Sequence, residues 1–441
     1  MTSVKTSSDD VITIIGAGWS GLACAVELAR HGRQVCVLEA ANTVGGRART
    51  VKLQDMTVDN GQHLLLGAYQ SFLSLLPILS VNEKDVLLRK TLRLNVRSLT
   101  GKGLLIQNNK LPGGLGKLWM LLQATGLTFS EKWRLSLFFV QLHRQQFVLQ
   151  TDMSAMDYLI SQGQSKQIIN MFWAPLCIAA LNTHPKQASS IVFLRVLKAS
   201  FTGSNNNSDL LFPKVLLGKL FAEPAVTYLR NQKHEVFMNT RVRVLQQHQH
   251  NWLLRTNKED FKSKQVVIAT SFRHASKLLS GLSAANNLIK QIEQFDTEPI
   301  VTIYMQFSPQ YQLDDYMLGL SDGLCQWFID RRSCGQAGMI AAVISANGPH
   351  NSLDKQSLIK QVIKEFSQLY PDWPEPQSCY LVREQQATFR CDVDVTNNRP
   401  NHFKISDSLW LTGDYIDNGL PATLESAVQN GVQCANEIIQ Q

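Results

Sequence analysis

The pattern of apolar positions is most regular at the start of the chain. An apolar run over residues 11–15 leads directly into Gly16, and small apolar residues then recur at helical spacing as far as Gly32. A second apolar run, residues 34–38, begins two positions later. Short apolar runs bounded by glycine are typical of buried strands, and the spacing between the two runs is that of a helix. The pattern predicts a strand, a tight turn, a helix and a second strand parallel to the first.

Two other regions predict a second structural unit. Residues 87–107 and 296–395 alternate apolar and polar positions, which favours strands of another sheet, with one amphipathic helix from Leu353 to Tyr370. Residues 111–202 are spaced as helices, and Thr128-Phe-Ser-Glu131 has the spacing of a capping box. The chain therefore leaves the first unit twice.

It also returns to that unit twice. After a helix that starts at Gly218, short strands are expected at residues 235–238, 240–245, 251–256 and 264–270. Near the C-terminus, residues 409–414 are typical of a strand that ends in a turn, and Pro421 opens a helix of small residues. Alternating strands and helices of this kind predict an α/β protein with a largely parallel sheet.

The glycines after the first strand have the spacing of a dinucleotide-binding loop. Gly16 allows the tight turn, Gly18 lets the backbone approach a pyrophosphate, and Gly21 lets helix and strand pack closely. The N-terminus of the helix then faces the anion. Glu39 ends the second strand, at the distance expected for binding a pair of ribose hydroxyls. GxGxxG strings also occur in ordinary turns, but here the flanking strand, helix and acid favour a dinucleotide site.

The residues after Glu39 resemble the ExxxxxGGR signature of flavin-dependent amine oxidases and carotenoid desaturases, which simple NAD dehydrogenases lack. In those families the paired glycines contact the flavin, the arginine lies beside it, and a GD near the C-terminus binds the ribityl chain. The resemblance implies that FAD is the cofactor, although Asp414 is also compatible with a plain turn residue. The residues expected to bind FAD are Gly16, Gly18, Gly21, Glu39, Gly46, Arg47, Gly61, Val242, Asp414 and Thr423.

Three narrower segments, residues 59–67, 172–189 and 419–428, resemble one family within that superfamily. These are the squalene-associated FAD-dependent desaturase-like proteins, described as hydroxysqualene dehydroxylases. The family implies reductive removal of the hydroxyl of hydroxysqualene, giving squalene in bacterial hopanoid synthesis. It also implies a Rossmann-like FAD-binding domain of the glutathione reductase type with an inserted α+β substrate domain and a helical region. We expect residues 1–75, 215–280 and 405–441 to form the FAD-binding domain and residues 76–214 and 281–404 the substrate-binding domain.

A polar cluster inside an apolar stretch is the candidate for catalysis. Burying Asp59, Asn60, Gln62 and His63 together is costly unless they bind one another or a ligand. The cluster is compatible with an Asx turn followed by a satisfied core histidine, or with a loop that runs along the flavin. An allylic alcohol leaves as water when it is protonated, so the reaction needs a proton donor, an apolar cavity and reduced FAD. His63 is the candidate acid, with Asp59 or Tyr415 as alternatives.

Other functions remain open. A desaturase or an amine oxidase would use the flavin in the oxidative direction, and a non-catalytic prenyl-binding protein, like the GTPase dissociation inhibitors, would not use it at all. Intact Glu39, Arg47 and Asp414 argue against the last. The chain has no second GxGxxG unit for a nicotinamide cofactor, so the electron donor is unknown.

Composition restricts the partners and the location. The 441 residues carry a net charge of +8 and a pI near 9.0, spread along the chain, which favours an anionic membrane surface over nucleic acid. The eight cysteines form no CxxC pair, so we expect reduced thiols, no disulfides and no metal. Residues 1–10 are polar, and no run of about 18 apolar residues occurs. We therefore expect a cytoplasmic protein, peripheral on the inner face of the cell membrane.

The candidate membrane contact is residues 111–147. A lipid-like substrate with no spanning helix to deliver it requires a surface that lies on the bilayer, with apolar groups inserted and basic groups at the headgroups. The apolar candidates are Leu115, Leu118, Trp119, Met120, Leu121, Leu122, Trp133, Leu137, Phe138 and Phe139, and the basic ones are Lys117, Lys132, Arg134, His143 and Arg144. Helices this apolar are also compatible with burial against the rest of the domain.

Overall fold

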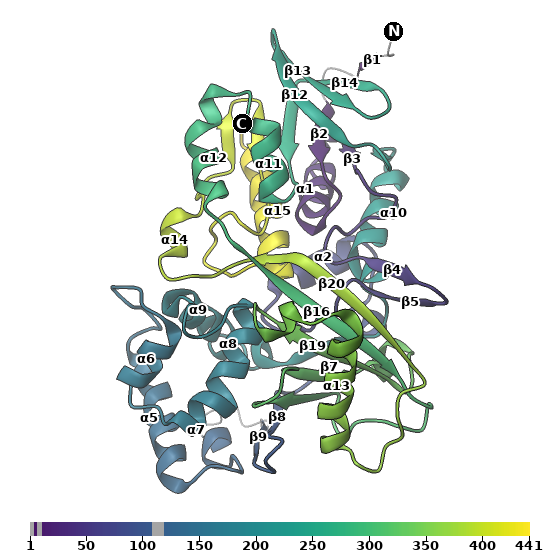
Figure 1. Cartoon of the computed structure of the whole chain (residues 1–441). Coiled ribbons are helices and arrows are strands. Elements are labelled where there is room, and N and C mark those ends of the chain that lie inside the picture. Colours follow the sequence, from purple (N-terminus) through teal and green to yellow (C-terminus); the bar gives the residue numbers. More distant parts are fainter. Residues whose placement is uncertain (1–3, 7–10, 108–118) are drawn as a thin grey trace.

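The computed structural model describes residues 4–6, 11–107 and 119–441, and the strand that leads into the glycine loop lies near the centre of a six-stranded sheet (Figure 1). Neighbouring strands of this sheet are parallel, except for the antiparallel pair at one edge. In order across the sheet the strands are β11 (Glu235–Phe237), β3 (Gln34–Leu38), β2 (Val11–Ile15), β15 (Gln265–Ile268), β22 (Leu409–Leu411) and β21 (Lys404–Ser406). The strands expected at the start, middle and end of the chain thus meet in one sheet, which confirms the α/β prediction.

Helices α1 (Trp19–Arg30) and α15 (Leu424–Ile439) pack against each other beside this sheet. They approach so closely that a Cβ on Gly431 would overlap the carbonyl oxygen of Ser20. Ser20 is also hydrogen-bonded to Thr412, with 2.9 Å between the hydroxyl oxygens. The two ends of the chain therefore hold the N-termini of both helices in fixed relative positions.

A seven-stranded sheet forms the second layer of strands. All its neighbouring pairs are antiparallel except β17 with β8. In order the strands are β20 (Ser378–Phe389), β16 (Thr297–Gln306), β19 (Met339–Ser345), β18 (Trp327–Asp330), β17 (Met317–Leu320), β8 (Arg93–Arg97) and β9 (Gly103–Gln107). Helix α13 (Lys355–Leu369) covers one face, where Phe366 packs against Phe307 and Phe328. The predicted hairpin and amphipathic helix are confirmed.

Three small sheets complete the strands. The predicted meander contains a strand that the sequence did not indicate, and it pairs with the first described segment of the chain. The small sheets are β1 (Val4–Thr6), β14 (Asp260–Ser263), β13 (Asn251–Thr256) and β12 (Val242–His248); β6 (Leu65–Leu66), β10 (Leu210–Pro213) and β7 (Leu87–Lys90); and β4 (Thr50–Leu53) and β5 (Met56–Asp59).

The helical region lies at the end of the molecule opposite β12–β14 (Figure 1). Helix α5 begins at the predicted capping box, in which Thr128 accepts a hydrogen bond from the Glu131 amide and Glu131 accepts one from the Thr128 amide. The helices of the region are α5 (Phe129–Arg144), α6 (Ala155–Ser161), α7 (Lys166–Ile168), a π-helical turn (Ile169–Trp173), α8 (Ala174–Leu181) and α9 (Ser190–Phe201). The other α-helices are α2 (Gln70–Ile78), α3 (Glu83–Val86), α10 (Glu223–Asn231), α11 (Phe272–Leu279), α12 (Asn286–Glu293) and α14 (Val395–Asn398).

Burial corrects part of the expected membrane contact. Four of the apolar candidates are buried, namely Met120, Leu121, Phe138 and Phe139, so they cannot meet a bilayer. The opposite face of α5, with Trp133 and Leu137, is exposed. Leu115, Lys117 and Leu118 lie outside the described residues. Among the helices that the structure describes, none combines the length and the apolar character needed to cross a membrane.

Candidate active site

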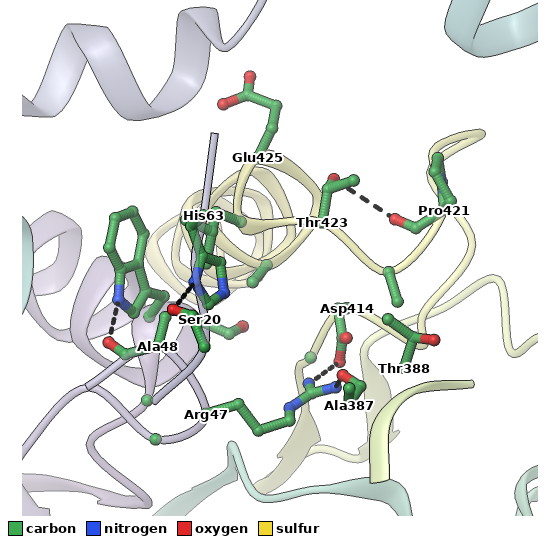
Figure 2. Close-up of a pocket in the computed structure, with 18 of the residues that line it drawn as sticks. Ser20, Arg47, Ala48, His63, Ala387, Thr388, Asp414, Pro421, Thr423 and Glu425 are labelled. Carbon is green, nitrogen blue, oxygen red and sulfur yellow. Dashed lines mark hydrogen bonds and ion pairs between the residues drawn. The ribbon is translucent and has the colours of Figure 1, made fainter. Parts of the chain in front are cut away.

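One cavity of about 1330 Å³ runs past the glycine loop and into the second unit. Figure 2 shows part of it, with Arg47, His63 and Asp414 around a common space. The cavity has a polar end, near the glycine loop, and an apolar end, between the seven-stranded sheet and helices α8 and α9. Polar walls come mainly from segments around residues 15–20, 38–49, 60–71, 240–243, 384–388 and 413–425.

The glycine loop has the geometry that its spacing predicts. Gly16 has a φ of +108°, and a Cβ there would lie 2.8 Å from the carbonyl oxygen of Ala269. A Cβ on Gly21 would overlap the carbonyl oxygen of Gly16, so the expected close packing of helix on strand is confirmed. Gly18 lies at the cavity wall with open space around its Cα, and α1 begins directly after it without a side-chain cap. The free amides of the first turn therefore remain available to an anion.

Glu39 is fixed at the edge of the polar end. One carboxylate oxygen accepts a hydrogen bond from the Ala17 amide and the other accepts one from the Ala41 amide, each at 2.7 Å. Each carboxylate oxygen has a further lone pair, and Glu39 lines the cavity. The carboxylate is thus held in one orientation while it can still accept hydrogen bonds from a ligand.

Arg47 and Asp414 form an ion pair that joins the two ends of the chain. Arg47 donates to Asp414 Oδ1 and to the carbonyl oxygen of Ala387, each at 2.7 Å (Figure 2). The sequence indicated both residues but not that they contact each other. Thr423 lies nearby as the N-cap of α15, where its hydroxyl accepts a hydrogen bond from the Ser426 amide at 3.1 Å. A second helix N-terminus therefore begins at the cavity wall.

His63 lies at the cavity wall on the loop that follows β5. Its Nδ1 is 3.0 Å from the carbonyl oxygen of Gly61, and a carbonyl can only accept, so Nδ1 carries a proton. Gly61 itself lines the cavity with a φ of +93°. Burial lowers the pKa of His63 below its ordinary value of 6.5. The neutral ring therefore predominates at pH 7 and leaves Nε2 as an acceptor, whereas the protonated ring would donate from Nε2.

The structure places the other two acid candidates away from the cavity. Asp59 is 1% exposed and forms an ion pair with Arg331, Nη2 to Oδ2 at 3.0 Å, while its other oxygen accepts from the Leu217 amide. Tyr415 is buried, packs against Phe272, and has no hydrogen-bond partner for its hydroxyl among the described residues. Neither lines the cavity. We correct the assignment of both as proton donors: Asp59 is paired with Arg331, which is 272 residues away in sequence, and the buried Tyr415 packs on Phe272.

Asp59 is nevertheless connected to the backbone of His63 by a chain of hydrogen bonds through Arg331 and Gln62. Arg331 donates hydrogen bonds to Asp59 and to the side-chain oxygen of Gln62. The backbone amide of Gln62 donates to the hydroxyl of Thr302 at 3.2 Å. Gln62 also donates to the carbonyl oxygen of His63 at 2.9 Å. Asp59 and Gln62 are therefore hydrogen-bonded to other parts of the protein, and Gln62 also binds the backbone of His63.

Most residues of the apolar end were not singled out by the sequence, although Leu176 and Ala180 lie in the segment 172–189 that carries the family resemblance. They come from the seven-stranded sheet, where alternation along the strands was the available signal, and from α8 and α9. The apolar lining includes Leu92, Leu94, Leu176, Ala180, Val196, Met317, Trp327, Ile329 and Val343. Trp327 and Val343 are cross-strand partners on β18 and β19. The lining also includes Arg241 and Arg243, on either side of Val242, and Lys277 of α11, which were also missed.

These residues fit a flavin dinucleotide. Two helix N-termini and the glycine backbone suit its phosphates, Glu39 suits a ribose, and the open Cα of Gly18 leaves space for close approach. Among the described residues no group of three or more His, Cys, Asp or Glu side chains is arranged to hold a metal ion.

Comparison with known proteins agrees with this geometry. The family model of flavin-containing amine oxidoreductases matches residues 19–439. The chain is 25% identical over 450 residues to a hydroxysqualene dehydroxylase of Zymomonas mobilis, covering 97% of this chain and 98% of the relative. It is 22% identical to a 15-cis-phytoene desaturase of Arabidopsis thaliana, covering 97% and 80%. Wild-type putrescine oxidase bound to putrescine has the same fold, with a TM-score of 0.75 at 15% identity over 99% of this chain and 100% of that one.

The match spans nearly the whole chain and includes α1 and α15, the two helices whose N-termini lie at the cavity. The predicted cofactor is confirmed: the protein uses FAD. The chain belongs to the family of flavin-containing amine oxidoreductases and is an FAD-dependent oxidoreductase.

Proposed function

We propose that the protein reductively removes the hydroxyl of hydroxysqualene and releases squalene, for hopanoid or related triterpenoid synthesis. The observation that carries this proposal is that His63 lines a cavity whose wall is polar near the glycine loop and apolar beside the seven-stranded sheet and helices α8 and α9. A C30 isoprenoid alcohol has one polar group and a long hydrocarbon chain, which matches this division. The relatives named hydroxysqualene dehydroxylase, which align over almost the full chain, support the same substrate.

The reaction exchanges a C–OH bond for a C–H bond. The hydroxyl takes up a proton and leaves as water, and the carbon receives a hydride, so alcohol, proton and hydride give hydrocarbon and water. Reduced FAD supplies the hydride when it is bound. The protein must hold the alcohol carbon at the polar end, keep bulk water from the developing cation and deliver the proton.

His63 is the proposed proton donor. Its Nδ1 proton is held by Gly61 O, so only the doubly protonated ring can release a proton from Nε2 toward the cavity. Because burial lowers the pKa of His63, this form is a minority at pH 7. We expect the rate of hydroxyl loss to rise as the pH falls toward that lowered pKa.

The cofactor contacts are part of the proposal. Gly16, Gly18 and Gly21 form the loop around the pyrophosphate, Glu39 binds a ribose, and the backbone at Val242 faces the adenine end. The groups beside the flavin are Gly46, Arg47, Gly61, Asp414 and Thr423. We propose that residues 1–75, 215–280 and 405–441 form the FAD-binding domain and that residues 76–214 and 281–404 bind the substrate.

The direct test uses the protein with its flavin reduced by dithionite. Under anaerobic conditions it is incubated with hydroxysqualene, and the products are identified by mass. We expect squalene, formed in a yield that matches the flavin oxidised. Unchanged hydroxysqualene alongside reduced flavin that is not reoxidised would contradict the proposal.

An oxidative desaturase is the second candidate, because 15-cis-phytoene desaturases align over 97% of the chain. The same assay in the opposite direction separates the two: oxidised protein with a polyene substrate would bleach its flavin and form a new double bond. An amine oxidase would bleach with a polyamine.

A further inference from the structure

Helix α5 is apolar on two opposite faces. Leu135, Phe138, Phe139 and Leu142 are buried, which accounts for one face. The opposite face carries Phe129, Trp133, Leu137 and Val140, which we call the α5 stripe, and these side chains are between 37% and 79% exposed. Their spacing of four, four and three residues places them along one side of the helix.

Exposed large apolar side chains are concentrated in this part of the protein. Of the nine large apolar side chains that are exposed in the described residues, eight lie between Trp119 and Ile160. The ninth, Val244, is on β12, at the other end of the molecule (Figure 1). Single exposed apolar residues are ordinary, but a cluster of this kind indicates an interaction surface.

The charges beside the stripe indicate an anionic partner. Helix α5 carries Lys132, Arg134 and Arg144, which lie within or beside the stripe, and one acid, Glu131. Glu131 is already engaged in the capping box and with the hydroxyl of Ser165. A second copy of the chain would place the same cations opposite one another, in a protein of net charge +8. An anionic lipid surface instead matches both the exposed aromatic side chains and the cations.

The stripe is also close to the apolar end of the cavity. On the buried side of α5, the ring of Phe139 packs on Trp173 and on Phe201, with centroids 5.7 Å and 5.4 Å apart. Phe201 is part of the cavity lining, as are Leu176 and Val196 of α8 and α9. A single layer of helices therefore separates α5, which carries the stripe on its outer face, from the cavity.

We propose that the α5 stripe docks on an anionic lipid bilayer, with Trp133 and Leu137 inserted below the headgroups, and that the apolar substrate enters the cavity through the α8–α9 layer behind it. The entry route rests on the proposed function, whereas the docking does not. Docking requires only the exposed apolar face and its cations.

The test measures sedimentation of the FAD-bound protein with vesicles of phosphatidylcholine alone or mixed with phosphatidylglycerol. We expect binding to the mixed vesicles that weakens as salt is raised from about 0.05 to 0.5 M, because screening shortens the reach of the cations. The double variant Trp133→Glu and Leu137→Glu should reduce the partition coefficient at least about tenfold. Val244→Glu is the matched control and should bind as the wild type does.

Flavin content and melting temperature show whether the double variant remains folded. If it unfolds, the variant Lys132→Gln, Arg134→Gln and Arg144→Gln replaces it, and should lose the preference for phosphatidylglycerol. Wild type that ignores both vesicle types, or double variant that binds as the wild type does, would overturn docking. So would a wild-type dimer that the double variant converts to monomer, since the stripe would then join two copies.

The reaction is measured separately on substrate dispersed in detergent. If the protein does not bind vesicles and squalene still forms, the proposed docking of the α5 stripe is wrong and the proposed reaction stands. If the protein docks and no squalene forms, the proposed reaction is wrong and the surface stands.

Discussion

The two ends of the cavity are built in different ways. At the polar end the functional groups are held by the backbone: Glu39 by two amides, Arg47 by a carbonyl and Asp414, and Thr423 by the first turn of α15. At the apolar end the wall consists of side chains such as Trp327 and Val343, which strands and helices from distant parts of the sequence bring together.

This difference determines what each end tolerates. Hydrogen bonds to the backbone fix the positions of the charged groups at the polar end, so substituting one of these residues removes a defined contact. An apolar wall binds by area, and its contribution is spread over many side chains. We therefore expect the effects of substitutions to be concentrated at the polar end and dispersed at the apolar end.

The largest effect is expected outside the cavity, at the buried pair of Asp59 and Arg331. Their side chains are 1% and 2% exposed, so Asp59→Ala would leave an unpaired guanidinium in the interior. We expect the free energy of unfolding to fall by about 3–5 kcal/mol, measured by urea denaturation. The matched control is Arg97→Ala, which removes the exposed pair with Asp314 and should change stability by about 1 kcal/mol or less. Equal effects of the two substitutions would contradict the role of burial.

The next effect concerns His63, the one residue at the boundary to which we assign proton transfer. His63→Ala should retain FAD and melting temperature yet lose about 100-fold or more of the rate. His63→Asn keeps a donor for Gly61 O and should be equally slow. In the wild type the rate of the chemical step should rise about tenfold per unit as pH falls from 8 toward the lowered pKa. Flavin-free or unfolded variants would support a structural histidine instead.

Glu39 tests the polar end alone. Glu39→Ala removes the carboxylate that we propose binds the ribose, and a charged acceptor of this kind contributes roughly 1.5–3 kcal/mol. The dissociation constant of FAD, titrated by flavin fluorescence, should rise about tenfold or more, while substrate affinity of the FAD-saturated protein is unchanged. Glu39→Gln keeps one oxygen acceptor and should have an intermediate effect. Wild-type FAD affinity in Glu39→Ala would show that this carboxylate does not bind the cofactor.

The same division explains what the sequence could predict. The glycine loop and Glu39 lie within one strand–helix–strand unit, so their spacing alone specifies their geometry. The α/β fold could also be predicted, because short apolar runs indicate strands in every part of the chain. Arg47 and Asp414 were indicated separately, by motifs at each end of the chain, but their contact spans 367 residues and no local pattern encodes it.

The errors arose where tertiary contacts decide the role of a residue. Asp59 is in a conspicuous polar cluster, yet its charge is neutralised by Arg331 and directed away from the cavity. Phe138 and Leu137 are adjacent and similarly apolar, but one faces the protein and the other faces solvent, since helical rotation separates neighbours by about 100°. The lining of the apolar end could not be predicted, because any buried strand residue has the same local pattern.

The smallest effect compares one chemical change at both ends of the cavity. Val→Thr preserves the shape of the side chain and replaces one methyl group by a hydroxyl. Both Val343 and Val242 line the cavity. At Val343 the added hydroxyl would face hydrocarbon when substrate is bound, and an unpaired hydroxyl costs about 0.5–2 kcal/mol. We expect KM for hydroxysqualene to rise about 2- to 30-fold in Val343→Thr, with FAD affinity unchanged.

At Val242 the proposed cofactor contact is through the backbone, and Arg241 and Arg243 keep the surroundings polar. Val242→Thr should therefore change FAD affinity and KM by less than about twofold. A larger loss of FAD in Val242→Thr than of substrate in Val343→Thr would reverse the assignment of the two ends, because the cost of a buried hydroxyl depends on whether the bound molecule offers it a partner.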